Sequence, residues 1–237
     1  MPRWRLLETS WEDRVLNLAF EWALPKLVGR AACPSTIRLW TNPACVVIGR
    51  SKLSLAEVKL DACRELGLPI LRRPTAGGAV YHDGGNLNWT VVAVREGYLK
   101  SIGPSELEGL AARAVLELLA SYGLEGHHEP RKGVFVNGRK TSGMAMYLAR
   151  DAVMVHGTLL VNADLGRLRR VLSCKYEVSN LVDLVGSRVE LGEVKALLAS
   201  CLARAFGVEL VGGGVRPIEL SLASALKGEV LVWPERK

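Results

Sequence analysis

The stretch RRPTAGGAVYHDGGNLN, residues 72–88, is the strongest local signal in the sequence. Two glycine pairs bracket a short strand-like segment, and residues 69–71 before them form a brief strand. A further strand, rich in Trp, Thr and Val, is predicted to follow over residues 86–94. Strands that are joined by such short turns favour a sheet that is largely antiparallel.

Outward from this stretch, apolar spacing predicts a mixture of strands and helices. The Asn137-Gly138 pair supplies the positive φ angles of a type I′ turn, so a hairpin is expected around it. Further strands are predicted at residues 4–7, 36–40, 45–48 and 154–161. Helices are predicted at residues 12–27 with Ser10 as the cap, and at 55–66, 105–122, 164–172 and 194–206. We therefore expect an α+β fold, with a mostly antiparallel sheet packed with helices.

The chain of 237 residues suits one large domain, which we place at residues 1–210. Residues 211–237 are predicted to be a C-terminal tail that begins as an extended segment at Gly212–Gly214. This tail is too short for a full accessory domain.

Composition narrows the classes of partner. The formal net charge of +7 favours an acidic partner. Nucleic acid is not expected, because no Lys/Arg block with interleaved aromatic residues occurs. A membrane span needs roughly 18 apolar residues in a row, and no run is that long. The five cysteines form no CxxC pair, so neither a metal site nor a disulfide framework is expected, and we predict a cytoplasmic protein.

The glycine-rich stretch has the residue types of an anion-binding loop. Glycines let backbone N–H groups approach a phosphate closely, while Arg72 and Arg73 supply cations for phosphate or carboxylate. The same spacing also fits a tight hairpin flanked by two surface arginines. It is neither a Walker loop nor a Rossmann fingerprint, because no Gly-Lys-Ser/Thr follows and no helix opens directly after the glycines.

Two later segments carry further candidates. Lys140 comes directly after the hairpin turn, where its ammonium group could neutralise a carboxyl and a phosphate as they react. An isolated lysine of this kind is more often simply solvated. In the segment His156-Gly157-Thr158, the glycine within a strand indicates a bulge or a close ligand. His156 alone is more often a hydrogen-bonded structural histidine.

Taken in order, these three segments resemble the lipoate–protein ligase family. Residues 72–88 look like its lipoate- and nucleotide-binding loop, residues 138–143 like its lysine motif, and residues 156–165 like its following strand and helix start. The resemblance runs from about Trp40 to about Leu172. It implies the biotin/lipoate ligase catalytic-domain fold, which agrees with the predicted strand order.

The resemblance also implies an activity. The family adenylates lipoate or octanoate with ATP and Mg²⁺, and then passes the acyl group to a lysine of a carrier domain. Its acceptors are lipoyl domains of 2-oxo-acid dehydrogenase complexes and the glycine-cleavage H protein. Lys140 would be the catalytic residue. The residues that would bind substrate and nucleotide are Arg73, Gly77, Gly78, Ala79, Val80, Tyr81, His82, Asn88, Lys140 and Gly157.

The sequence departs from the family pattern in three places. Lys132-Gly133 stand where the family usually has Asn-Asp, and the segment after Leu172 lacks the usual basic, serine-containing loop. No accessory domain follows, so a separate accessory chain is expected, as in two-component ligases. An arginine cluster (Arg167, Arg169 and Arg170) could steer an acidic lipoyl domain.

Two other functions stay open. Cys174 lies ten residues after Asp164, a spacing similar to that of octanoyl transferases, so a Cys174–Lys140 pair could transfer an acyl group without ATP. The proline and glycine that flank the cysteine in that family are missing here. The departure at Lys132-Gly133 also permits a non-catalytic binder of lipoyl-adenylate or of the carrier domain. Biotin is disfavoured, because the sequence has no Gly-Arg-Gly-Arg loop.

Overall fold

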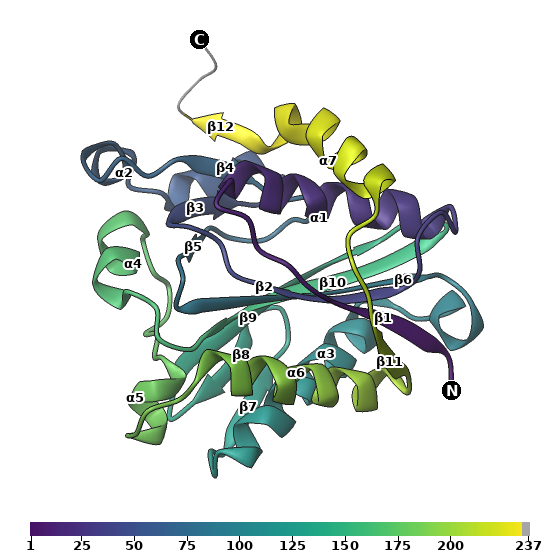
Figure 1. Cartoon of the computed structure of the whole chain (residues 1–237). Coiled ribbons are helices and arrows are strands. Elements are labelled where there is room, and N and C mark those ends of the chain that lie inside the picture. The colour runs from purple at the N-terminus through teal and green to yellow at the C-terminus, as the bar shows by residue number, and fades with distance from the viewer. Residues whose placement is uncertain (234–237) are drawn as a thin grey trace.

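Two sheets form the framework of the computed structural model, which describes residues 1–233 (Figure 1). The large sheet has eight strands, in the spatial order β11 (Glu209–Gly212), β1 (Arg3–Glu8), β2 (Thr36–Trp40), β6 (Asn86–Val94), β10 (Ala152–Leu160), β9 (Arg139–Leu148), β8 (Gly133–Val136) and β7 (Gly126–Glu129). The small sheet has four, in the order β12 (Leu231–Trp233), β4 (Ile70–Arg72), β3 (Cys45–Ile48) and β5 (Val80–His82).

Most ladders in both sheets are antiparallel. The parallel ladders join β1 to β11, β1 to β2 and β3 to β4. The central strands β6 and β10 pair in continuous register from Asn86↔Leu160 to Val94↔Ala152. The predicted α+β class with a mostly antiparallel sheet is therefore confirmed.

Helices cover both faces of the large sheet (Figure 1). The helices are α1 (Arg14–Gly29), α2 (Leu60–Glu65), α3 (Pro104–Ser121), α4 (Leu165–Val171), α5 (Leu181–Val185), α6 (Leu191–Phe206) and α7 (Pro217–Val230), with 3₁₀ turns η1 (Lys52–Glu57) and η2 (Gly97–Lys100). Helices α3 and α6 pack on one face and α1 and α7 on the other, while α2 and α4 cover the small sheet. Such layering buries an apolar face of the packed helices and of the central strands.

Local chemistry explains two differences from the sequence predictions. Asp13, and not Ser10, caps α1, because its carboxylate accepts the N–H groups of Val15 and Leu16. The single helix predicted over residues 55–66 is divided into η1 and α2. Val58, at the division, instead forms an isolated antiparallel bridge with Leu172.

The C-terminal segment is not the extended tail predicted from Gly212. Helix α7 lies along α1, and β12 joins the small sheet at β4. Pro217 stands in the first turn of α7, and the Glu219 carboxylate accepts the Arg216 N–H at 2.7 Å. These signals begin a helix soon after the glycines. Residues 234–237 of the predicted tail lie outside the described residues.

A buried ion pair fastens this segment to the first strand. The Arg5 guanidinium donates to Glu219 Oε2 at 3.0 Å and to the carbonyl of Gly214 at 2.9 Å. Both side chains are almost fully shielded from solvent. Removing one partner of such a pair leaves an uncompensated buried charge.

We therefore expect Glu219→Ala to lower the free energy of unfolding by about 3 kcal/mol, as measured by urea denaturation. Glu209→Ala is the matched control, because Glu209 on β11 also pairs with an arginine of β1, Arg3, but both side chains are exposed. The control should change stability little. Equal losses in the two variants would show that Glu219 does not hold the C-terminal segment in place.

Candidate active site

The glycine-rich loop between β4 and β5 is held from inside by Arg73. Its buried guanidinium donates to the carbonyls of Ala76 and Gly78, both at 2.8 Å, and to Thr75 Oγ1 at 3.0 Å. Gly77 adopts φ +104°, a conformation that favours glycine. Burial lowers the pKa of Arg73 to about 10, so the side chain stays charged at neutral pH. The arginine thus fixes the loop by binding its carbonyl groups.

A β-bulge sets the direction of Lys140 on β9. Phe135 pairs with Lys140, but the next residue back, Val134, pairs with Ser142, so Thr141 is the extra residue. Bulges re-aim neighbouring side chains and are frequent beside active sites. The Lys140 N–H donates to the carbonyl of Glu177 at 2.8 Å, which places residues 173–179 alongside this end of β9.

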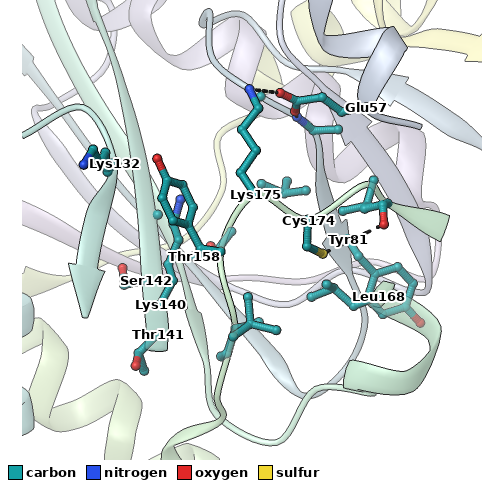
Figure 2. A pocket seen from close by; sticks show the side chains of 18 of the residues that line it. Glu57, Tyr81, Lys132, Lys140, Thr141, Ser142, Thr158, Leu168, Cys174 and Lys175 are labelled. Atoms are coloured by element: carbon teal, nitrogen blue, oxygen red, sulfur yellow. Dashed lines mark hydrogen bonds and ion pairs between the residues drawn. The ribbon is translucent and has the colours of Figure 1, made fainter. Parts of the chain in front are cut away.

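The Lys140 side chain lies between two adjoining cavities of about 240 and 150 Å³, and it lines both. Its ammonium group lies 5.5 Å from the centre of the Tyr176 ring. Burial lowers the pKa of Lys140, whereas the nearby Glu57 carboxylate opposes that shift. Figure 2 shows the larger cavity, with Lys132, Ser142 and Thr158 around Lys140.

The structure brings to these two cavities every residue that the family resemblance assigns to substrate and nucleotide binding. Arg72, the other arginine of the glycine-rich stretch, lines neither cavity. The smaller cavity is lined by Arg73, Gly77, Gly78, Ala79, Val80, His82, Asn88, Lys140 and Gly157. Tyr81 lines the larger cavity, which shares Gly78, Ala79, Val80 and Lys140 with the smaller one. Three segments that are distant in sequence therefore meet at one place.

Two of these residues present polar atoms that no described residue satisfies. His82 Nδ1 and Asn88 Nδ2 are buried and have no hydrogen-bond partner within residues 1–233. Burial, followed by the charge of Arg73, lowers the pKa of His82 to about 3, so this imidazole is neutral at physiological pH. Both side chains line the smaller cavity, where they can hydrogen-bond a ligand.

Gly157 has a structural reason that the sequence did not reveal. The register of β10 is continuous with both neighbouring strands at this position, so there is no bulge. A Cβ atom here would lie 2.4 Å from the Trp89 indole and 2.7 Å from the carbonyl oxygen of Gly143. The glycine therefore allows the indole to pack across the strand, and it also lines the smaller cavity.

A buried polar network behind the loop was missed in the sequence. The Glu21 carboxylate accepts from Arg38 at 2.7 Å and from Thr90 at 2.6 Å, and it contacts His156 Nδ1 at 3.3 Å. His156 Nε2 lies 2.7 Å from Thr75 Oγ1, at the start of the glycine loop. His156 is thus hydrogen-bonded on both sides. The available signal was Glu21 itself, a charge within the apolar face of α1.

Four charged side chains around the larger cavity were also missed: Glu57, Arg131, Lys132 and Lys175. Lys132, at the position where the sequence departs from the family pattern, pairs with Glu129 at 2.8 Å. Lys175 pairs with Glu57 at 2.6 Å, as the dashed line in Figure 2 shows. Lys132 lies directly before Gly133, the first residue of β8, which adopts an unusual φ of +130°.

Cys174 lines the larger cavity but does not have the surroundings of an activated nucleophile. Its Sγ lies 3.9 Å from the carbonyl oxygen of Leu172, and Figure 2 shows the side chain directed toward Tyr81 and Leu168. Cys174 is an exposed residue, but partial desolvation of its thiol still raises the pKa, although Arg169 and Lys59 act in the opposite direction. A nucleophilic cysteine usually has a lowered pKa.

Residues 1–233 contain no group of three or more His, Cys, Asp or Glu side chains placed to hold a metal ion. In the same part of the chain, every helix is too short or too polar to cross a membrane.

Comparison with known proteins identifies the family. The model of the lipoyl protein ligase A/B catalytic domain matches residues 13–203. A protein of Aeropyrum pernix, provisionally named a lipoate-protein ligase A, is 31% identical over 85% of this chain and 79% of its own length.

Solved structures agree with this assignment. A Thermoplasma acidophilum protein, described provisionally as a lipoate protein ligase and solved with lipoic acid, has a TM-score of 0.84 at 26% identity, covering 97% of this chain and 96% of its own. A bipartite lipoate protein ligase of the same organism, studied with its E2 lipoyl domain, has a TM-score of 0.83 at 25% identity, covering 97% and 93%. A lipoate-protein ligase A bound with ATP has a TM-score of 0.83 at 26% identity, covering 97% and 95%.

These matches also confirm the predicted lipoate ligase fold. The family model covers most of the chain, and the aligned structures extend over nearly all of it. The chain therefore belongs to the lipoyl protein ligase A/B catalytic-domain family and is an enzyme of the lipoate–protein ligase class.

Proposed function

We propose that this enzyme adenylates lipoate or octanoate with ATP and transfers the acyl group to a lysine of a lipoyl domain. The observation that carries the proposal is the position of Lys140, whose side chain lines both cavities. One cavity would hold the acyl chain and the other the nucleotide. The similar structures with lipoic acid and with ATP support this pair of ligands.

The smaller cavity suits the acyl chain. Its lining includes the apolar side chains of Leu18, Trp40, Val47 and Met144, and such walls favour an aliphatic ligand. The Lys140 ammonium group lies at the boundary with the larger cavity, where the acyl carboxylate would meet the α-phosphate. The charge would attract both groups and orient them for reaction.

The reaction would proceed in two displacements. In the first, a carboxylate oxygen forms a bond to the α-phosphorus, and the bond from that phosphorus to pyrophosphate breaks. In the second, the neutral amine of the acceptor lysine forms an amide bond to the acyl carbon. AMP then leaves with the bonding electron pair, and the amine loses its proton to solvent. Lys140 would stabilise the negative charge that develops in both steps.

ATP and its Mg²⁺ are substrates in this scheme. Glu57 is the carboxylate that lines the larger cavity, and it is already engaged by Lys175, so we propose that Mg²⁺ arrives with the nucleotide. We further propose a cytoplasmic enzyme that works with a separate accessory chain. The acceptors would be lipoyl domains of 2-oxo-acid dehydrogenase complexes or the glycine-cleavage H protein, consistent with the E2 lipoyl domain of the similar bipartite ligase.

The first test is acylation of a lipoyl domain, followed by intact-protein mass spectrometry. The assay is run with and without a candidate accessory chain, and in the presence of that chain the acceptor should gain one lipoyl or octanoyl group only when ATP is present. Lys140→Met should slow this gain by about 10²- to 10³-fold, because it removes the charge beside the reacting groups. Lys100→Met, an exposed lysine on η2, is the control. If the acceptor gained no mass under any condition, the chain would be a binder and not a ligase.

The second test separates the ligase from a transferase that would use Cys174 and Lys140. We expect Cys174→Ala to retain ATP-dependent acylation within about twofold, because the surroundings of the thiol do not favour the thiolate. The acyl donor in a parallel assay is octanoyl carrier protein without ATP. Octanoylation in that assay that disappears in Cys174→Ala would establish the transferase instead.

The third test concerns recognition of an acidic acceptor. Arg169 and Arg170 are exposed on α4, and Arg170 pairs with Glu65 at 2.8 Å. Reversing both charges should raise the KM for a lipoyl domain by about threefold to tenfold at low salt, and less at high salt. The same reversal at Arg150, exposed in the turn between β9 and β10, should leave KM unchanged. A KM that did not respond at low salt would exclude steering by this helix.

A further inference from the structure

The Glu57 carboxylate lies at the glycine loop like a bound anion. Its Oε2 accepts the Ala79 N–H at 2.7 Å, and its Oε1 pairs with the Lys175 ammonium at 2.6 Å. The Glu57 side chain is about one-fifth exposed. Gly78 permits this approach, since a Cβ atom there would lie 2.5 Å from Glu57 Oε2.

Further cations surround the same carboxylate. The charge of Arg73 stabilises the Glu57 carboxylate, and the charge of that carboxylate in turn stabilises the protonated form of Lys140. Burial opposes ionisation, but hydrogen bonds from Lys175 and from the Ala79 N–H, together with the charges of Lys175 and Arg73, lower the pKa of Glu57. One carboxylate thus receives a backbone N–H from a glycine turn and lies among three cationic side chains.

These groups are the ones that proteins use to bind phosphate. Backbone N–H groups of glycine-rich turns form concave anion sites, and lysine is a common phosphate-binding cation. We propose that the Ala79 N–H and Lys175 form a phosphate subsite of the nucleotide cavity, and that Glu57 competes with a phosphate group for them. This inference rests on the nucleotide site proposed above.

The backbone around Glu57 allows the carboxylate to leave without unfolding the loop. The carbonyl of Glu57 accepts the Ser173 N–H at 2.8 Å, and the Lys59 N–H donates to the carbonyl of Val171 at 2.8 Å. These bonds hold η1 against the segment that carries Lys175 independently of the Glu57 side chain. Rotation of that side chain alone would free both donors for a phosphate oxygen.

The test is binding of inorganic pyrophosphate and of ATP, each with Mg²⁺ and with EDTA, measured by isothermal titration calorimetry. Glu57→Gln keeps an oxygen acceptor for the Ala79 N–H but removes the competing charge. We expect it to tighten binding of pyrophosphate and metal-free ATP by about fivefold to twentyfold. Lys175→Met, in the Glu57→Gln background, should remove most of this gain.

Glu65→Gln is the matched control, because it removes one carboxylate from an exposed ion pair that does not line either cavity. It should leave both affinities unchanged, and thermal melting should show that every variant is folded. Unchanged or weaker binding in Glu57→Gln would show that Glu57 only braces the loop. Weakening confined to samples with Mg²⁺ would show that Glu57 is a metal ligand. Either result would contradict the proposal that Glu57 competes with phosphate for the Ala79 N–H and Lys175.

These outcomes are separate from the test of the proposed function. Pyrophosphate binding is measured without lipoate or acceptor, so it can follow the expected pattern even if no acyl transfer occurs. Conversely, acceptor acylation with no change of affinity in Glu57→Gln would uphold the ligase and reject the phosphate subsite.

Discussion

The ion pair between Arg38 and Glu21 is the constraint on which the site depends. Both side chains are fully buried, and the Arg38 guanidinium lies 4.4 Å from the centre of the Trp40 ring. Buried charges are costly unless further hydrogen bonds compensate them, so the pair requires further partners. His156 is one such partner: its Nδ1 contacts Glu21, and its Nε2 lies 2.7 Å from Thr75 Oγ1. A charge in α1 thereby fixes the start of the glycine loop.

The groups around the two cavities differ in how firmly the protein holds them. The loop is anchored by the contact between Thr75 and His156 and by the hydrogen bonds of Arg73 to its carbonyl groups, so its backbone N–H groups have fixed directions. Lys140 is equally fixed by a bulge and by two backbone bonds to the 173–179 segment. Lys175, in contrast, is largely exposed and reaches the loop only through Glu57. Preorganised charges suit the chemical step, whereas an exposed lysine with room to move suits binding and release of the nucleotide.

The sequence predicted those elements whose signals are local. The apolar runs at 36–40, 45–48 and 86–94 match their strands residue for residue, and Asn137-Gly138 forms the expected turn between β8 and β9. Contacts between residues that are distant in the sequence could not be predicted from it. Glu21 and His156, for example, are 135 positions apart. Strands β7 and β11 are short and lie at the sheet edges, where polar or glycine-rich sequences have no alternating pattern. The candidate site was predicted from an ordered set of motifs, but Glu57 and Lys175 belong to none of them.

The charge distribution explains why such a site needs an anionic substrate. Within residues 1–233, Lys132 and Lys175 each have a carboxylate partner, whereas no ion pair joins Lys140 to a carboxylate within 4 Å. Partial burial of an unpaired ammonium group is unfavourable, and this cost is part of the lowered pKa of Lys140. An acyl carboxylate or a phosphate at the boundary of the two cavities would compensate the charge directly. An ammonium group that is unfavourably placed in the free protein therefore gains from binding the substrates and from stabilising the charge that develops between them.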